Sequence, residues 1–150
     1  MRFIHNDGGR TAAGFAGTTG DCVCRSIAIA AQRPYAEVYA ALNHLAQAER
    51  PRKGGKRSAS RTGVFVQRGW FKTYMGSLGF RWVPTMTIGS GCKVHLRDGE
   101  LPAGRLVVNV SRHCTAVIDG DCHDTHDPTR DGTRCVYGYW IHEPLSEITA

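Results

Sequence analysis

Apolar and polar positions follow a helical period soon after a glycine-rich start. A loop of Gly, Thr and Ala (14–20) leads to Asp21, a residue type that caps helices, and we predict a helix whose first turn contains Cys22. A thiol at a helix start lies at the positive end of the helix dipole, which favours the thiolate. Cys22 is therefore either a nucleophile or a small apolar residue packed at a helix start. The apolar face of this helix comprises Val23, Ile27 and Ala30.

Two more helices are predicted before residue 80. Pro34 suits the first turn of one helix, because its ring presets a helical backbone angle. Its apolar residues at helical spacing are Tyr35, Val38, Leu42 and Leu45. The pattern of residues 64–78 predicts the other helix. Gly69 lowers the helix propensity of this segment, and Gly79 is suited to end the helix. Its apolar face comprises Val66, Trp70, Phe71, Tyr74 and Leu78.

From residue 80 onward the pattern changes to short apolar, β-branched runs separated by turn residues. Asp119-Gly120 is a strong signal for a two-residue hairpin turn. Helices followed by strands indicate an α+β fold, with N-terminal helices packed on a C-terminal antiparallel β-sheet. The predicted strands are 80–84, 105–110, 113–118, 121–125 and 134–141.

Length and composition indicate a single domain over residues 1–150. The chain is 41% hydrophobic and 21% charged, and is long enough to bury a core without disulfides or metal ions. No apolar run could span a membrane and the N-terminus lacks a signal-peptide core, so we expect a cytoplasmic protein without membrane contact. In that compartment we expect the six cysteines to be thiols, with Cys92 and Cys135 buried. Their even number leaves three disulfides as the alternative.

The net charge of +6 is concentrated in one segment, 49–61. Such a run can contact phosphates or an acidic protein surface. It has two adjacent glycines and no aromatic residue to stack on a base, so we expect a mobile, solvated basic loop and do not favour nucleic acid as a partner. Its basic residues are Arg50, Arg52, Lys53, Lys56, Arg57 and Arg61.

The hairpin turn determines which side chains face one another. If Asp119-Gly120 is a two-residue turn, strand pairing places His113 opposite His126. Alternate residues share a face of a sheet, so Asp124 lies diagonally across from His113 on the same face. We therefore predict that these two side chains touch. Asp127 has the wrong parity unless the strand ends before it, and it is the reserve carboxylate.

Cys22, His113 and Asp124 supply the three parts of an activated nucleophile. The imidazole takes the thiol proton or forms an ion pair with the thiolate, and later protonates the leaving group. The carboxylate holds the imidazole in one tautomer and favours the imidazolium. This chemistry needs no cofactor and no metal.

The two segments that carry these residues resemble the papain-like cysteine peptidase superfamily. Residues 20–28 (GDCVCRSIA) place a cysteine at a helix start. Residues 113–128 (HCTAVIDGDCHDTHDP) resemble the His-strand, Asp-Gly turn and Asp-strand of transglutaminase-like and bacterial leader-processing peptidases. The whole chain is similar to small papain-like proteins of phages and bacteria, and the resemblance covers about residues 20–140.

The resemblance implies a papain-like fold with a Cys–His–Asp site in a cleft between the helices and the sheet. It implies hydrolysis or transfer at an amide, isopeptide or thioester acyl group. A peptidase or isopeptidase acting on a peptide or protein is the leading function, in the cytoplasm of a bacterium or of a phage-infected cell.

The oxyanion donor departs from the family pattern. Papain-like enzymes place Gln or Asn shortly before the nucleophile, and residues 15–21 contain neither. Asp21 also adds negative charge beside Cys22, which would raise the pKa of the thiol unless the carboxylate is committed to capping the helix. The oxyanion candidates that remain are the Cys22 backbone N–H, Thr18, Thr19 and Asn6.

Two other classes of function stay open. A catalytically silent papain-like protein would use the basic loop to bind nucleic acid or a host protein. A zinc protein would draw on the many Cys and His residues. Their spacing matches no closed zinc pattern, and Cys114 and Cys122 point to opposite faces of the predicted hairpin.

Overall fold

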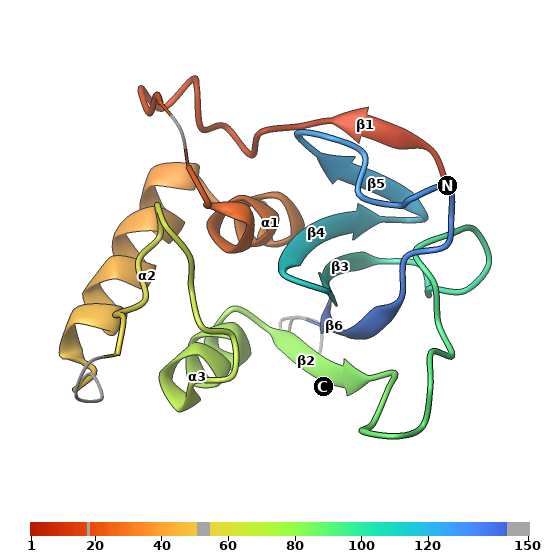
Figure 1. The fold of residues 1–150 in the computed structure, drawn as a ribbon. Helices are drawn as coiled ribbons and strands as arrows, with labels where there is room; N and C mark the ends of the chain where they lie inside the picture. The colour runs from red at the N-terminus through yellow and green to blue at the C-terminus, as the bar shows by residue number, and fades with distance from the viewer. Residues whose placement is uncertain (18, 51–54, 144–150) are drawn as a thin grey trace, which may run out of the picture.

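A computed structural model describes residues 1–17, 19–50 and 55–143 (Figure 1). Thr18, Arg52 and Lys53 lie outside these residues. In Figure 1 the sheet is seen close to edge-on, and the helices gather on one side of it. The elements within the described residues are β1 (Phe3–His5), α1 (Cys22–Ala31), α2 (Tyr35–Ala48), α3 (Gly69–Ser77), β2 (Phe80–Pro84), β3 (Arg105–Val110), β4 (His113–Ile118), β5 (Asp121–Asp124) and β6 (Val136–His142).

The sheet has the strand order β1-β5-β4-β3-β6-β2. The α+β class is confirmed, with the helical layer before most of the strands. The expectation of a purely antiparallel sheet is wrong at one edge, because β1 pairs in parallel with β5. A three-residue strand is too short for an alternating pattern to reveal it in the sequence.

The hairpin between β4 and β5 has the predicted register. Ile118 is paired with Asp121 and Ala116 with His123. The turn residues Asp119 and Gly120 both have positive φ, 47° and 84°, as a type I′ turn requires.

α1 and α2 begin where the sequence indicates, but α3 begins later than predicted. Val23, Ile27 and Ala30 of α1 are buried as expected. Arg68 precedes α3 in an extended conformation (ψ 142°), so the segment before it does not join the helix. Val64 and Val66 pack beside the core cluster under the helices while also lining a cleft, which accounts for their apolar spacing.

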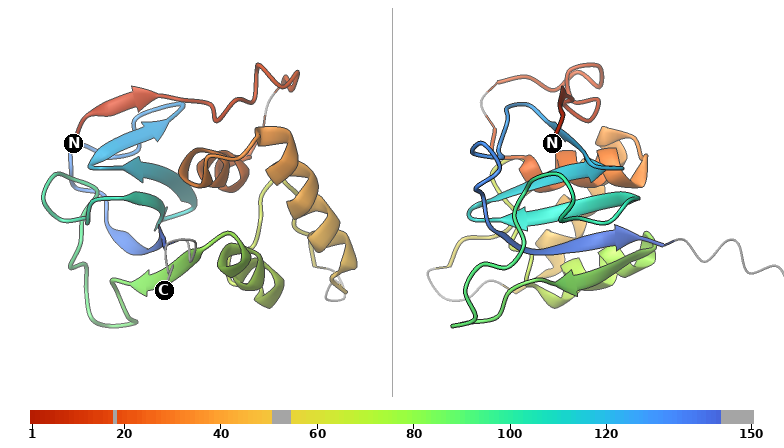
Figure 2. Two further views of the ribbon diagram at one scale, coloured as in Figure 1. Left: turned by 180° about the vertical axis from the view of Figure 1, so that it is seen from behind. Right: turned by 90° about the vertical axis from the view of Figure 1, so that its right-hand side faces the viewer.

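The sheet carries a hydrophobic core on each face. The helices cover one face with residues that include Ile27, Leu42 and Phe71. The loop between β2 and β3 covers the other face, where Leu96 is fully buried against Leu106 and other strand residues. Figure 2 shows this loop crossing in front of the strands in its right-hand view.

Cys92 and Cys135 form a disulfide, so the expectation that they are buried thiols is wrong. His95 pairs with Cys135 in an isolated β-bridge, which brings the loop beside the start of β6. The two Cα atoms are then 5.8 Å apart, within disulfide range. The other four cysteines are free thiols: Cys22, Cys24, Cys114 and Cys122.

The described part of the basic segment is attached to α2. The Ser60 backbone N–H donates to Asn43 Oδ1 (2.9 Å), and the Ser60 hydroxyl donates to the Tyr39 carbonyl (2.6 Å). Arg57 donates to the carbonyls of Ala46, Gln47 and Glu49 at the end of α2. Arg57 therefore stabilises a helix terminus, which is a structural role for a residue expected to bind a partner.

Among the described residues, none of the helices has both the length and the apolar character that crossing a membrane requires.

Candidate active site

Cys22 is the first residue of α1 and faces a cleft of about 860 Å³. The loop before it is fixed, because the Gly20 N–H donates to the Arg61 carbonyl at 2.7 Å. A cleft of this volume is of the size that holds small ligands and peptide segments. His113, at the start of β4, lines the same cleft.

The His113 ring is bonded to Asp124. Nε2 of the ring is 2.7 Å from Oδ2 of the carboxylate, and Asp124 is almost fully buried. This contact leaves Nδ1 of the ring for Cys22. The reserve carboxylate Asp127 lies elsewhere and accepts the Thr129 N–H at 2.9 Å. His126 lies beside His113, with ring centroids 5.2 Å apart.

The Cys22 thiol and the His113 imidazole each shift the pKa of the other. A hydrogen bond from Cys114 and the neighbouring His113 lower the pKa of Cys22 to about 4, against the opposing effect of burial. Burial lowers the pKa of His113, but its hydrogen bonds to Asp124 and Cys22 outweigh this effect and raise the pKa to about 9. Both shifts favour the thiolate and the imidazolium over the neutral pair near neutral pH.

Burial favours the neutral form of Asp124, yet the hydrogen bond and charge of His113 lower the pKa of this carboxyl to about 2. Asp124 is thus ionised at every pH at which Cys22 is a thiolate. Its permanent negative charge holds the His113 proton and fixes the orientation of the ring.

Cys114 is a neighbour of Cys22 that the sequence did not indicate as part of the candidate site. Its hydrogen bond to Cys22 and its burial raise the pKa of Cys114 well above the ordinary value. Its sulfur is also 3.2 Å from Oδ1 of Asn109. One thiol carries one proton, so the Cys22 thiolate and the Asn109 carbonyl compete for it.

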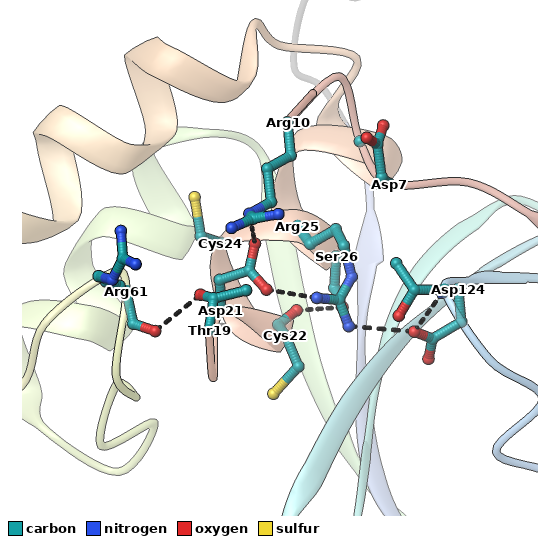
Figure 3. Close-up of polar contacts among 12 residues, drawn as sticks. Asp7, Arg10, Thr19, Asp21, Cys22, Cys24, Arg25, Ser26, Arg61 and Asp124 are labelled. Carbon is teal, nitrogen blue, oxygen red and sulfur yellow. Dashed lines mark hydrogen bonds and ion pairs between the residues drawn. The ribbon is translucent and has the colours of Figure 1, made fainter. Parts of the chain in front are cut away.

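Asp21 occupies the N-cap position of α1, but its carboxylate does not cap the helix. It receives hydrogen bonds from Arg25 and from the Tyr35 hydroxyl (2.6 Å), and Arg10 Nε is 3.6 Å away. Arg25 also donates to Asp124 at 3.1 Å. Figure 3 shows the Arg25 guanidinium between the two carboxylates. The negative charge of Asp21 beside Cys22 is thus matched by Arg25.

The proposed side-chain oxyanion donors fall in different places. The Thr19 hydroxyl donates to the Arg61 carbonyl (2.8 Å), so its proton is committed (Figure 3). Oδ1 of Asn6 accepts the Gly8 N–H (2.9 Å) and Nδ2 of Asn6 is 3.2 Å from His123 Nδ1, so the Asn6 side chain is also committed. Thr18 lies outside the described residues.

Two amide side chains that the sequence did not single out line the cleft, Gln67 and Asn109. Asn109 is the strand neighbour of Cys114, and its Oδ1 contact with that thiol leaves its NH₂ group as a donor. The N–H groups of a first helical turn have no acceptor within the helix, so the Cys22 N–H is a second donor. Only the fold brings these groups together, because they come from separate elements.

Metal-binding geometry is not found in the part of the chain that the structure describes, where no group of three or more Cys, His, Asp or Glu side chains could hold an ion. Cys24 is buried in the helical core and its burial raises the pKa of the thiol to about 12. Cys122 is buried near Thr115 (3.4 Å), on the other side of the hairpin from Cys114.

Comparison with protein-family models, curated proteins and solved structures found no match. The papain-like resemblance therefore stays a prediction, and any function must be argued from the site itself.

Proposed function

We propose that this protein is a cysteine-dependent acyl hydrolase or transferase that acts on peptide or isopeptide bonds. The observation that carries the proposal is the His113–Asp124 contact of 2.7 Å in the cleft that Cys22 lines. A thiolate at a helix start, an imidazolium and a buried carboxylate are the parts that acyl transfer through a thioester requires.

In this mechanism the Cys22 thiolate attacks the carbonyl carbon and a C–S bond forms. The negative charge moves to the carbonyl oxygen, where the Cys22 N–H and the Asn109 amide donate hydrogen bonds. His113 gives its proton to the leaving amine as the C–N bond breaks. A water or acceptor nucleophile then loses its proton to His113 and attacks the thioester, which releases the acyl product and restores the thiolate.

The test measures the rate of iodoacetamide alkylation of Cys22 as a function of pH, with mass spectrometry to assign the modified cysteine. We expect labelling to increase with a midpoint near pH 4, because the thiolate is the reacting form and the pKa of Cys22 is about 4. In His113→Ala the midpoint should move up toward the ordinary thiol value. Circular dichroism at each pH would verify that the protein is folded.

Turnover is tested with p-nitrophenyl acetate, which should leave an acetyl group on Cys22. We expect His113→Ala to slow turnover by about 10²–10⁴-fold, as for loss of a general acid–base. The matched control is His126→Ala, which removes a neighbouring ring that has no hydrogen bond to Asp124 among the described residues. Slow labelling of Cys22 at pH 6, at the rate of an ordinary thiol, would overturn the proposal and favour a non-catalytic binding protein.

A further inference from the structure

A row of strand residues leads from the thiols into the far part of the cleft. Cys114, Asn109 and Gly138 are register neighbours on β4, β3 and β6, so they share the face of the sheet that the helices cover. Adjacent strands lie about 4.8 Å apart, which places Gly138 about 10 Å from Cys114 along this row. An extended peptide that reaches Cys22 can therefore span this distance with about three residues.

Trp82 of β2 lies over Gly138. A Cβ atom at Gly138 would be 2.4 Å from Cζ2 and Cη2 of Trp82, so only glycine leaves room for the indole. Trp82 remains 37% exposed and lines the cleft, with its ring centroid 5.2 Å from that of Trp140. The two indoles form an aromatic wall in which Trp82 is the exposed member.

Trp140 adds an unpaired donor to this wall. Its side chain is 6% exposed and lines the cleft, and its Nε1–H has no hydrogen-bond acceptor among the described residues. Most buried donors in proteins are paired. A bound group that brings an acceptor to this wall would satisfy it.

The exposed charges along the described cleft lining are positive, Lys72 and Arg112. The carboxylate in the lining, Asp21, is buried and bonded to Arg25. Lys72, Trp82 and Trp140 line the same cleft, so this positive charge and the aromatic wall belong to one lining. The cleft therefore favours a negatively charged occupant.

We propose that Trp82, positioned over Gly138, is the specificity-determining surface for an aromatic side chain of a peptide substrate that also carries a carboxylate. This inference rests on the proposed function, because it names the class of substrate that Cys22 attacks. Stacking of the side chain on the indole provides the selectivity, and Lys72 and Arg112 attract the carboxylate.

The test follows the indole N–H signals of the Cys22→Ala protein by NMR, after labelling tryptophan with ¹⁵N. The chain has three tryptophans, and Trp70 is an internal control because its Nε1 donates to Glu49 (3.0 Å) outside the cleft. Addition of N-acetyl-Phe-Glu-amide should shift the Trp82 and Trp140 signals and leave the Trp70 signal in place. N-acetyl-Ala-Glu-amide and N-acetyl-Phe-Lys-amide should bind at least about threefold more weakly.

Variants locate the binding surface. Trp82→Ala should abolish the shift of the Trp140 signal, whereas Trp82→Phe should retain part of it. Phe65→Ala removes an aromatic residue that is 44% exposed outside the cleft lining, and should change nothing. Equal shifts with the Phe and Ala peptides, or binding that survives Trp82→Ala, would overturn this inference.

Failure here is distinguishable from failure of the proposed function. The NMR readout uses a protein without the nucleophile and reports only the aromatic surface. Iodoacetamide labelling of the wild-type protein reports only the nucleophile. Rapid labelling of Cys22 without selective peptide binding would leave the enzyme proposal in place and remove Trp82 from it.

Discussion

At the scale of single residues, the reactivity of Cys22 depends on two neighbours that act differently. His113 contributes a positive charge and a hydrogen bond, whereas Cys114 contributes hydrogen bonds from its thiol and from its backbone N–H. Cys114 also faces Asn109, which competes for its proton. Cys22 and Asn109 are the two acceptors for the Cys114 proton. The balance between them decides how much of the low pKa of Cys22 depends on Cys114 and how much on His113.

Replacement of Cys114 separates the two contributions. In Cys114→Ala we expect the pH midpoint of Cys22 alkylation to increase from about 4, because the largest cause of its low pKa is removed. We expect the midpoint of Cys114→Ala to stay below that of His113→Ala, because the imidazolium retained in Cys114→Ala supplies both a charge and a hydrogen bond to Cys22. An unchanged midpoint would mean that the Cys114 proton resides on the Asn109 contact. Cys24→Ala is the control, because that thiol lies in the helical core.

Part of the candidate site could be predicted from the sequence alone, and part could not. The pairing of His113 with Asp124 was predictable, because a two-residue turn fixes the strand register and hence the facing side chains. Asn109 and Gln67 could not be found in this way. They enter the cleft from β3 and from the segment before α3, and no local spacing relates those elements to Cys22.

At the scale of elements, Arg25 joins α1 to the sheet. Its guanidinium is bonded to Asp21 at the start of its own helix and to Asp124 at the end of β5. A burial pattern cannot predict such a contact, because a charged residue on the inner face of a helix appears in the sequence as an interruption of that face. Short strands are equally hard to predict, as β1 demonstrates.

Loss of Arg25 should be costly, since it leaves two buried carboxylates without their shared partner. For Arg25→Met we expect unfolding free energy to fall by about 3–5 kcal/mol, measured by urea denaturation. The matched control is Arg33→Met, whose pair with Glu37 is exposed and should contribute about 0–1 kcal/mol. Comparable losses in the two variants would show that the buried contacts of Arg25 add nothing to stability.

At the scale of the whole molecule, the two faces of the sheet are stabilised in different ways. The helices cover one face of the sheet, and Cys22 is the first residue of α1. The loop between β2 and β3 covers the other face and is joined to the residue before β6 by the Cys92–Cys135 disulfide. The sequence could not reveal this bond, because six cysteines offer many pairings and only the path of the loop selects one.

The disulfide should stabilise the fold without affecting the pKa of Cys22. It joins residues 43 positions apart, so we expect its reduction by dithiothreitol to lower the unfolding free energy by about 2–4 kcal/mol. The pH midpoint of Cys22 alkylation should stay the same in the reduced and oxidised proteins. A Cys92→Ser/Cys135→Ser variant should be insensitive to the reductant. Equal stability before and after reduction would show that the bond does not form in solution.

The bond between Arg25 and Asp124 has a consequence for synthesis of the chain. The two residues are 99 positions apart, so α1 leaves the ribosome long before the strands that carry His113 and Asp124. Until β4 and β5 dock, Cys22 has neither the imidazolium nor Cys114 beside it and behaves as an ordinary, weakly ionised thiol. We therefore expect Cys22 of a nascent chain to react at the rate of an ordinary thiol until β4 and β5 have folded against α1.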